Sequence, residues 1–200
     1  MVIAGVMIDE VDEEKLRKIG VKDSKMLKPH QRERLYPLIK KIAKDYVALK
    51  VSAKEIDELM KIKNLNIIEA EKMAQIIKTL GADVAYVDTP QVSTEKFKMI
   101  LLNLAKNHTK IIAENYCDET YPVCSAASII AKVERDREVE EIKKIVGFDF
   151  GVGYSHDQRS IDFVKKCLKD KKCLEYIRHS WTTVDGLKSK KEQKSLKEYK

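Results

Sequence analysis

The sequence lacks the features that mark several classes of protein. Glycine and proline number only 7 and 4 among 200 residues, which excludes a collagen-like chain. No apolar run approaches the roughly 18 residues that a membrane-spanning helix needs. Residues Met1–Ile8 are apolar but have no basic start and no cleavage-type end, so they indicate a strand rather than a secretion signal. Apolar residues make up 44% of the chain, which excludes overall disorder and predicts a folded core.

Cysteine is also scarce, and its spacing excludes the common metal frameworks. The four cysteines form no Cys-x-x-Cys pair, and the four histidines do not join them at zinc spacing. We therefore expect reduced thiols in a cytoplasmic protein that has no membrane partner.

What the sequence does have is charge, with a basic excess. Lys and Arg number 39 against 32 Asp and Glu, giving a net charge of +7. A polyanionic partner, nucleic acid first, is one interpretation, and a lysine-rich surface without such a partner is the other. The basic excess is largest over residues 186–200, which contain six lysines and two glutamates. This composition predicts a flexible basic tail.

Apolar runs alternate with segments of helical periodicity along the chain. This alternation predicts an α/β domain over 1–150, a helical segment over 151–185 and the tail over 186–200. Continuous rather than alternating apolar strands indicate a sheet covered on both faces. The predicted strands are 1–8, 46–51, 84–87 and 110–113, and the predicted helices are 29–44, 66–80, 94–106, 122–145 and one that opens at Asp157.

Carboxylates follow two of the predicted strands. Asp88 ends the strand 84–87, and Asp118 lies shortly after the strand 110–113. Ligands of open α/β sheets bind at such strand ends, and Mg²⁺ prefers one or two carboxylates with water and phosphate. The alternative is that both are solvated turn residues, and Asp9 with Glu10 competes for the same role.

Other polar residues suit contacts with a nucleic acid. Lys25, in a turn before a helix, can neutralise phosphate, and Tyr154, between glycines and a polar loop, can stack on a sugar or base. Ser125 and Ser128 can meet a phosphate at a helix start. Each has a plainer interpretation, as a solvated lysine, a packing tyrosine and packing serines.

Taken together, five segments resemble type 2 ribonuclease H (ribonuclease HII) in its archaeal form. They occur in the family's order and cover residues 1 to about 185, and the third is highly specific. The segments are Val21–Leu27, Tyr86–Pro90, Cys117–Arg137, Gly151–Asp157 and Arg178–Thr182.

The resemblance implies a ribonuclease H-like mixed sheet flanked by helices. It implies endonucleolytic cleavage of RNA in RNA–DNA hybrids, including cleavage 5′ to a single ribonucleotide in DNA, by a two-metal mechanism with Mg²⁺ or Mn²⁺. Asp88 and Asp118 match two of the family's four metal-binding acids. Tyr154 matches the tyrosine that senses the 2′-hydroxyl, and Lys25 matches a lysine that contacts phosphate. We expect a monomer.

One departure concerns the family's opening segment, a strand with Asp-Glu followed by Ala-Gly-Arg-Gly. No Gly-Arg-Gly follows Asp9 and Glu10, so we expect that the first strand and two metal-binding acids are absent from this chain. We therefore expect weak or no cleavage by the 200 residues alone. The alternative function is a catalytically inactive module that binds RNA–DNA hybrids.

The tail carries a second resemblance. Gln193, Leu196 and Tyr199 fit Gln-x-x-aliphatic-x-x-aromatic, which is similar to the peptide by which replication proteins bind the sliding clamp. Lys200 stands where the second aromatic is usual, so the motif is incomplete. The alternative is a basic tail that adds non-specific affinity for phosphates.

Overall fold

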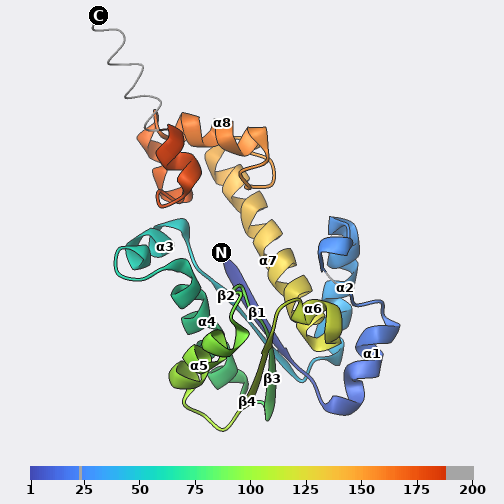
Figure 1. Ribbon diagram of the computed structural model, residues 1–200. Coiled ribbons are helices and arrows are strands. Elements are labelled where there is room, and N and C mark those ends of the chain that lie inside the picture. Colours follow the sequence, from blue (N-terminus) through green and yellow to red (C-terminus); the bar gives the residue numbers. More distant parts are fainter. Residues whose placement is uncertain (23, 188–200) are drawn as a thin grey trace, which may run out of the picture. The chain divides into compact units, whose positions relative to one another are not determined.

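Four strands and the helices between them follow the predicted alternation. The computed structural model describes residues 1–22 and 24–187 (Figure 1). The strands are β1 (Val2–Met7), β2 (Asp45–Lys50), β3 (Val84–Asp88) and β4 (Lys110–Glu114). The α-helices are α1 (Glu13–Lys18), α2 (Pro29–Ile42), α3 (Ala53–Met60), α4 (Leu65–Leu80), α5 (Thr94–Ala105), α6 (Cys117–Thr120), α7 (Pro122–Val146) and α8 (Gln158–Cys167). Short 3₁₀ helices span Glu10–Asp12, Ser24–Met26 and Lys171–Tyr176.

The chain divides into two compact units. The first comprises Met1–Lys50 and Asn64–Arg135, and the second comprises Val51–Lys63 and the described residues from Asp136 onward. Helix α7 contributes residues to both units. The units thus divide the chain elsewhere than at residue 150, where the sequence analysis placed a boundary, and that boundary stays a prediction.

In the first unit the strands form a layer between helices. Strands β1 and β2 pair antiparallel, with Val2 opposite Lys50, and β3 and β4 pair parallel, with Asp88 opposite Glu114. Helices α4 and α5 pack on one side of these strands, and α2 with the first half of α7 packs on the other (Figure 1). This is the mixed α/β arrangement with helices on both faces that the sequence predicts.

Two apolar cores fill the space on the two sides of the strands. On the α2 and α7 side the fully buried side chains are Leu16, Leu35, Ile39, Ile129, Ile130 and Val133. On the α4 and α5 side the buried side chains include Ala70, Ala74, Phe97, Leu101 and Ile111. Burial of this apolar surface is the main term that holds the strands between the helices.

Strands β1 and β3 run in opposite directions. A Cβ atom added at Gly5 in β1 would lie 3.0 Å from Leu80 Cδ1 and would overlap Ile76, so the C-terminal half of β1 lies against the end of α4. Strand β3 begins at Val84, directly after that helix end. The C-terminal end of β1 therefore lies near the start of β3, and Asp9 lies away from Asp88.

The second unit has its own aromatic and aliphatic core. Phe150, Phe163, Val164 and Val184 are buried there, and the Phe150 and Phe163 rings stack with centroids 4.6 Å apart. Trp181 is partly buried and packs against this core.

The Asp57 carboxylate ties helix α3 to the segment near residue 180 of this unit. Asp57 accepts hydrogen bonds from the backbone amides of His179 (2.7 Å) and Ser180 (2.8 Å). Burial opposes ionisation of Asp57, but the hydrogen bonds from Ser180 and His179 outweigh it and lower the pKa of the carboxyl. Among the described residues, no helix combines the length and apolarity needed to cross a membrane.

Candidate active site

Asp88 is the last residue of β3, where the strand leaves the apolar core. Val87 before it is buried, whereas Asp88 is half-buried and its Oδ1 accepts a hydrogen bond from the backbone amide of Cys117 (3.2 Å). Asn115 holds the loop that follows Asp88. With its side-chain amide turned so that the nitrogen faces acceptors, Asn115 donates hydrogen bonds to the backbone carbonyls of Thr89 (3.2 Å) and Gln91 (3.0 Å). The carboxylate therefore has a fixed place at the strand end.

Asp118 lies on α6, the short helix that follows β4. Tyr116 has φ +59°, a left-handed conformation that lets the chain turn from the strand into this helix. The Asp118 side chain is only 3% exposed, and the Ser125 hydroxyl donates to the Asp118 backbone carbonyl. Asp118 is thus a buried carboxylate, and its interpretation as a solvated turn residue is wrong. Ser125 is itself buried and holds the turn, which argues against its role as a phosphate contact.

A pair of buried thiols lies next to the two carboxylates. Cys117 and Cys124 are buried free cysteines next to them. A hydrogen bond with Cys117, burial, and the charges on Asp88 and Asp118 all raise the pKa of the Cys124 thiol. Because Asp88 accepts a hydrogen bond from the amide of Cys117, the residue directly before Asp118, the structure brings the two predicted metal ligands together. All four cysteines of the chain are free and buried.

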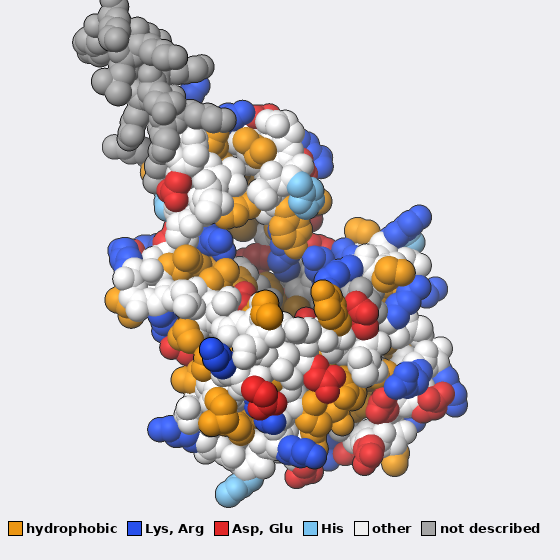
Figure 2. All heavy atoms as spheres, in the orientation of Figure 1, with side chains coloured by type: hydrophobic (Ala, Val, Ile, Leu, Met, Phe, Trp, Pro, Cys, Tyr) orange, Lys and Arg blue, Asp and Glu red, His pale blue; other side chains and the backbone are white. Residues whose placement is uncertain are grey.

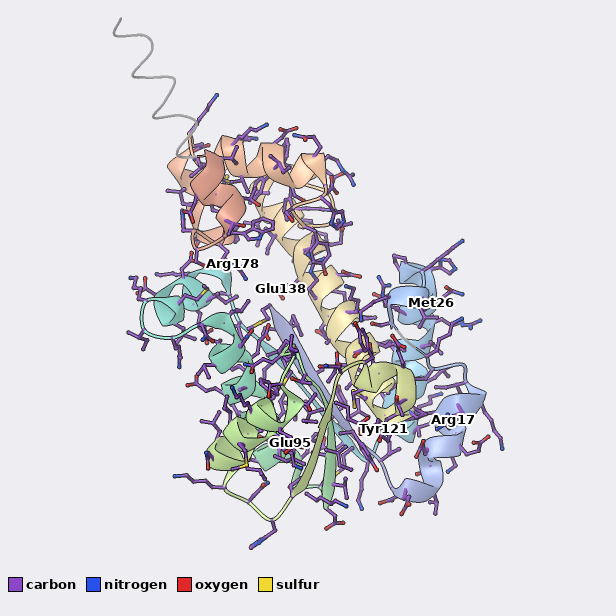
Figure 3. The ribbon with its side chains drawn as sticks, in the orientation of Figure 1. Arg17, Met26, Glu95, Tyr121, Glu138 and Arg178 are labelled. Carbon is purple, nitrogen blue, oxygen red and sulfur yellow. The ribbon has the colours of Figure 1, made fainter. Side chains whose placement is uncertain are left out.

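A third carboxylate, Glu114, lies near Asp88 and was missed by the sequence analysis. It is the register partner of Asp88 on β4, and its Oε1 accepts from the Tyr121 hydroxyl (3.3 Å). The Tyr121 ring packs against the Tyr86 ring, and the two ring centroids are 4.2 Å apart (Tyr121 is labelled in Figure 3). Burial and then the charge on Glu114 raise the pKa of Tyr121. The available signal was the position of Glu114 at the end of a predicted strand.

The donor set at this strand edge suits a hard divalent cation. Mg²⁺ and Mn²⁺ prefer carboxylate oxygens as ligands. The pKa of the nearby Cys124 thiol is raised, so this thiol stays protonated and is a poor ligand. Among the described residues Asp88 forms no ion pair with Lys or Arg, so no side-chain cation neutralises it. The described part of the chain also contains no group of three His, Cys, Asp or Glu side chains placed to hold a metal. The residues present therefore fit part of a metal site, to which Asp88 and Asp118 could supply two carboxylates.

The remaining predicted residues lie elsewhere in the structure. Lys25 is exposed in the 3₁₀ turn Ser24–Met26 of the first unit. Asp9 is exposed and forms an ion pair with Lys44 (3.0 Å), so its carboxylate is already paired with a side-chain cation. Gln193, Leu196 and Tyr199 lie outside the described residues.

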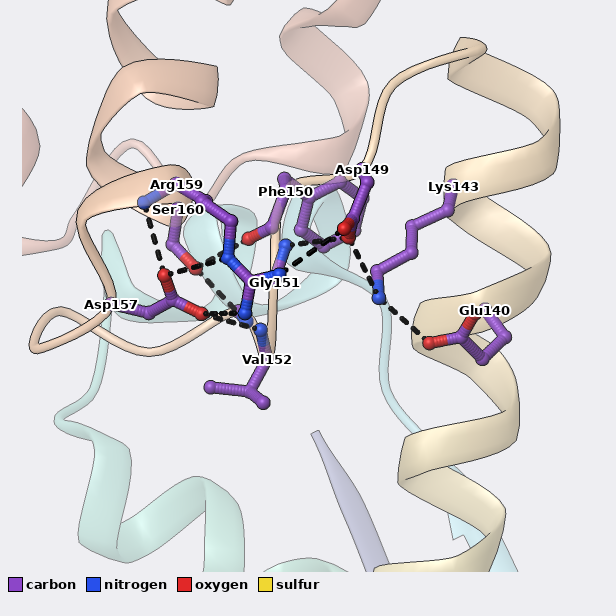
Figure 4. A network of polar contacts seen from close by, with 10 residues as sticks. Glu140, Lys143, Asp149, Phe150, Gly151, Val152, Asp157, Arg159 and Ser160 are labelled. Atoms are coloured by element: carbon purple, nitrogen blue, oxygen red, sulfur yellow. Dashed lines mark hydrogen bonds and ion pairs between the residues drawn. The ribbon is translucent and has the colours of Figure 1, made fainter.

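Tyr154 lies in a loop and follows a stretch whose backbone is held by side chains. Three successive amides are bound in this way: Gly151 N donates to Asp149 Oδ1, Val152 N to Asp157 Oδ2 and Gly153 N to Ser160 Oγ, each at 3.0 Å (Figure 4). The Ser160 hydroxyl in turn donates to the carbonyl of Phe150 (2.7 Å). Asp157, Ser160 and Asp149 therefore fix the backbone directly before Tyr154.

Gly151 is required in this loop for two reasons. Its φ is +71°, and a Cβ atom there would overlap the Asp157 carboxylate. Arg159 and Asp157 also pair through their side chains, with Arg159 Nη2 3.0 Å from Asp157 Oδ2. This pairing and the Val152 amide lower the pKa of Asp157 to about 2. The Gly151 amide and then Lys143 lower the pKa of Asp149.

Beyond the fixed backbone, the Tyr154 ring stacks on His156, with centroids 5.6 Å apart. Tyr154 is half-buried, so part of its ring faces solvent. It belongs to the second unit, whereas Asp88 and Asp118 belong to the first.

Comparison with solved structures defines the class of fold. The chain is similar to the ribonuclease HII in a PCNA:RNase HII complex from Archaeoglobus fulgidus, with a TM-score of 0.83 and 42% identity over 92% of this chain and 86% of that chain. It is also similar to Bst-RNase HIII, solved in complex with Mn²⁺, with a TM-score of 0.76 and 15% identity over 92% of this chain and 62% of that chain. At that identity the second similarity concerns the fold alone. The fold is thus that of the type 2 ribonucleases H and their relatives.

Sequence comparison defines the family within that class. The family model for Ribonuclease HII matches residues 1–184. A curated Ribonuclease HII from Archaeoglobus fulgidus is 43% identical over 190 residues, which are 95% of this chain and 90% of that protein. The chain therefore belongs to the ribonuclease HII family, whose members are endonucleases acting on RNA–DNA hybrids. The resemblance in the sequence analysis is confirmed.

Proposed function

We propose that this protein hydrolyses the RNA strand of RNA–DNA hybrids and cleaves 5′ to single ribonucleotides in DNA by a two-metal mechanism. The observation that carries the proposal is the convergence of Asp88 and Asp118, from neighbouring strand ends, next to Cys117 and Cys124. Membership of the ribonuclease HII family supports the class of reaction.

In this proposal Asp88 and Asp118 hold Mg²⁺ or Mn²⁺. A divalent cation bound there would stabilise negative charge on the phosphate and promote deprotonation of the attacking water. The Cys117 amide donates a hydrogen bond to one oxygen of the Asp88 carboxylate and so orients the carboxylate for this role. Asp118 is preset by its burial and by the α6 turn that Ser125 closes.

Lys25 and Tyr154 would bind the substrate. An exposed lysine in a short turn can reach a phosphate, and an aromatic hydroxyl on a fixed loop can hydrogen-bond a 2′-hydroxyl. The 2′-hydroxyl is the group that distinguishes RNA from DNA, so Tyr154 would determine where cleavage occurs. The fixed backbone of Gly151–Gly153 supports this assignment.

The tail would bind a sliding clamp through Gln193, Leu196 and Tyr199. The relative from Archaeoglobus fulgidus was solved in complex with PCNA, which supports this kind of partner. Binding of a clamp by the wild-type protein, lost in the double variant Leu196→Ala/Tyr199→Ala, is the expected result. Equal binding by both would reject the tail as the contact and leave its basic charge as its contribution.

We expect the 200-residue chain by itself to cleave weakly or not at all, because two carboxylates are fewer than the four that the family resemblance implies. The second candidate function is a catalytically inactive module that binds RNA–DNA hybrids. The absence of a three-ligand metal group among the described residues favours it. Robust metal-dependent cleavage by this chain would reject both the expectation of weak cleavage and the hypothesis of a catalytically inactive binding module.

The test uses a labelled DNA duplex with one ribonucleotide and measures both cleavage and Mn²⁺ binding. The variants are Asp88→Asn and Asp118→Asn, with Asp83→Asn as matched control, since Asp83 is exposed at the other end of β3. We expect Mn²⁺ binding and any cleavage to fall about 100-fold or more in both site variants and to persist in Asp83→Asn. Unchanged Mn²⁺ binding in Asp88→Asn would contradict the metal assignment. Hybrid binding without cleavage, in the presence of bound Mn²⁺, would establish the inactive module.

A further inference from the structure

Tyr116 is an exposed aromatic residue in the turn that joins β4 to the candidate metal site. It follows Asn115, whose side chain holds the loop after Asp88. It precedes Cys117, whose amide donates to the Asp88 carboxylate (3.2 Å), and Asp118 is the next residue along the chain. The backbone at Tyr116 therefore has a fixed place close to both carboxylates.

The turn itself does not require a tyrosine at this position. Tyr116 has φ +59°, and its carbonyl accepts a hydrogen bond from the Glu119 amide (2.9 Å). This left-handed conformation costs free energy for a residue with a bulky side chain, whereas glycine and asparagine adopt it more readily. Either of those residues would therefore form the same turn with less backbone strain.

Packing of the Tyr116 ring does not explain the residue either. The side chain is 64% exposed, and within residues 1–22 and 24–187 no other ring and no side-chain cation stacks on it. Tyr121, a few residues later, differs in this respect, because its ring packs against Tyr86. Backbone strain that persists without such compensation is typical of positions that meet a ligand.

We propose that Tyr116 is a substrate-binding residue whose ring packs against the sugar–phosphate backbone of an RNA–DNA hybrid, beside the phosphate held at Asp88 and Asp118. This inference rests on the proposed function and holds equally for a nuclease and for a hybrid-binding module. Paired bases in a duplex are covered by their neighbours, so a ring next to a phosphate meets the sugar. Tyrosine suits that contact because it combines an apolar ring with a polar tip.

The experiment measures the Kd of the full chain for a labelled RNA–DNA hybrid by fluorescence anisotropy, with chelator so that the RNA strand stays intact. Tyr116→Asn removes the ring and keeps a residue suited to positive φ, and Tyr116→Phe keeps the ring. We expect Kd to rise about fivefold or more in Tyr116→Asn and to stay within about twofold in Tyr116→Phe. The rise should be the same for hybrids of different sequence, because sugar and phosphate carry no sequence information.

Lys106→Asn is the matched control for backbone strain. Lys106 also has positive φ (+47°), but it ends α5 and precedes the start of β4, at the opposite end of that strand from Tyr116. Both Asn variants relieve strain, so neither should have a lower Tm than the wild type. Only Tyr116→Asn should bind the hybrid more weakly.

Salt dependence separates a ring contact from an effect of charge. Loss of the ring should leave the slope of log Kd against log salt unchanged, whereas Lys25→Ala should reduce it by about one. An unchanged Kd in Tyr116→Asn, or weaker binding accompanied by a lower Tm, would overturn this inference alone. Failure of the wild-type chain to bind the hybrid would overturn both this inference and the proposed function.

Discussion

At the scale of single residues, the candidate site depends on contacts between segments distant in sequence. Asp88 was predictable because a carboxylate at the end of an apolar strand is a recognisable pattern. The burial of Asp118 was not, because Cys117–Thr120 has the composition of a polar turn, and Cys117 and Asp118 are buried where this turn contacts β3 and α7. Glu114 was overlooked for the same reason, since its position beside Asp88 follows from the β3–β4 register.

Gly151 offers a test of the loop that precedes Tyr154. We expect Gly151→Ala to lower the free energy of unfolding by about 1–3 kcal/mol more than Gly147→Ala, because Asp157 must move and lose its backbone contacts. Gly147 is the matched control, since it has φ +62° but no atom within 4 Å of an added Cβ. Urea unfolding followed by Trp181 fluorescence measures both, because Trp181 is the only tryptophan and packs on the core of the second unit. Equal losses would mean that the Asp157 contacts contribute little.

Asp157 also predicts a pH dependence. Its pKa in the folded protein is about 2, below the value of about 3.9 expected in the unfolded chain. A depressed pKa gives stability that is fully present above about pH 4 and is lost as the pH falls toward about 2. The wild type should therefore lose stability across this window more steeply than Asp157→Asn. Parallel pH profiles for the two proteins, again measured with Trp181, would contradict this assignment.

At the scale of secondary-structure elements, most of the fold was predictable, but the short helices α1, α3 and α6 were not. Strands β1 to β4 and helices α2, α4, α5 and α7 match their predicted ranges within a few residues, because each is long and strongly patterned. Helix α3 was missed, although Ser52 and Glu55 form a recognisable start, with Ser52 Oγ accepting from the Glu55 amide. No local pattern indicated that the short α3 segment joins residues near 180.

That joining of α3 to the second unit can be tested at Asp57. Replacement of Asp57 by Ala removes the acceptor for the amides of His179 and Ser180, and we expect a loss of about 2 kcal/mol in the free energy of unfolding. The matched control is Glu58→Ala, which breaks only the exposed ion pair with Lys61 and should change stability by less than about 0.5 kcal/mol. Faster hydrogen exchange at 179 and 180 in Asp57→Ala would locate the effect. Equal stability of the two variants would show that α3 is held by its apolar contacts instead.

At the scale of the whole molecule, the net charge of +7 predicts salt-sensitive binding to duplexes. Blue Lys and Arg side chains are interspersed with red Asp and Glu on the face shown in Figure 2, so the attraction should come from local contacts rather than from one uniform field. If three phosphates are neutralised, affinity for an RNA–DNA hybrid should fall about 40-fold between 50 and 200 mM salt. A fluorescence-anisotropy titration at several salt concentrations measures the slope. An affinity that does not change with salt concentration would favour the alternative interpretation, a lysine-rich surface that does not bind a polyanionic partner.

The three backbone amides bound by Asp149, Asp157 and Ser160 have a consequence for the thermodynamics of recognition. Ordering the backbone of a free loop costs about 1–2 kcal/mol per residue, and a loop that folds around its ligand gives up that entropy on binding. In this protein the loop loses its conformational entropy when the protein folds, because hydrogen bonds already fix the loop backbone without a ligand. A nucleotide that meets Tyr154 should therefore bind with a small entropy penalty from this loop and without a slow ordering step.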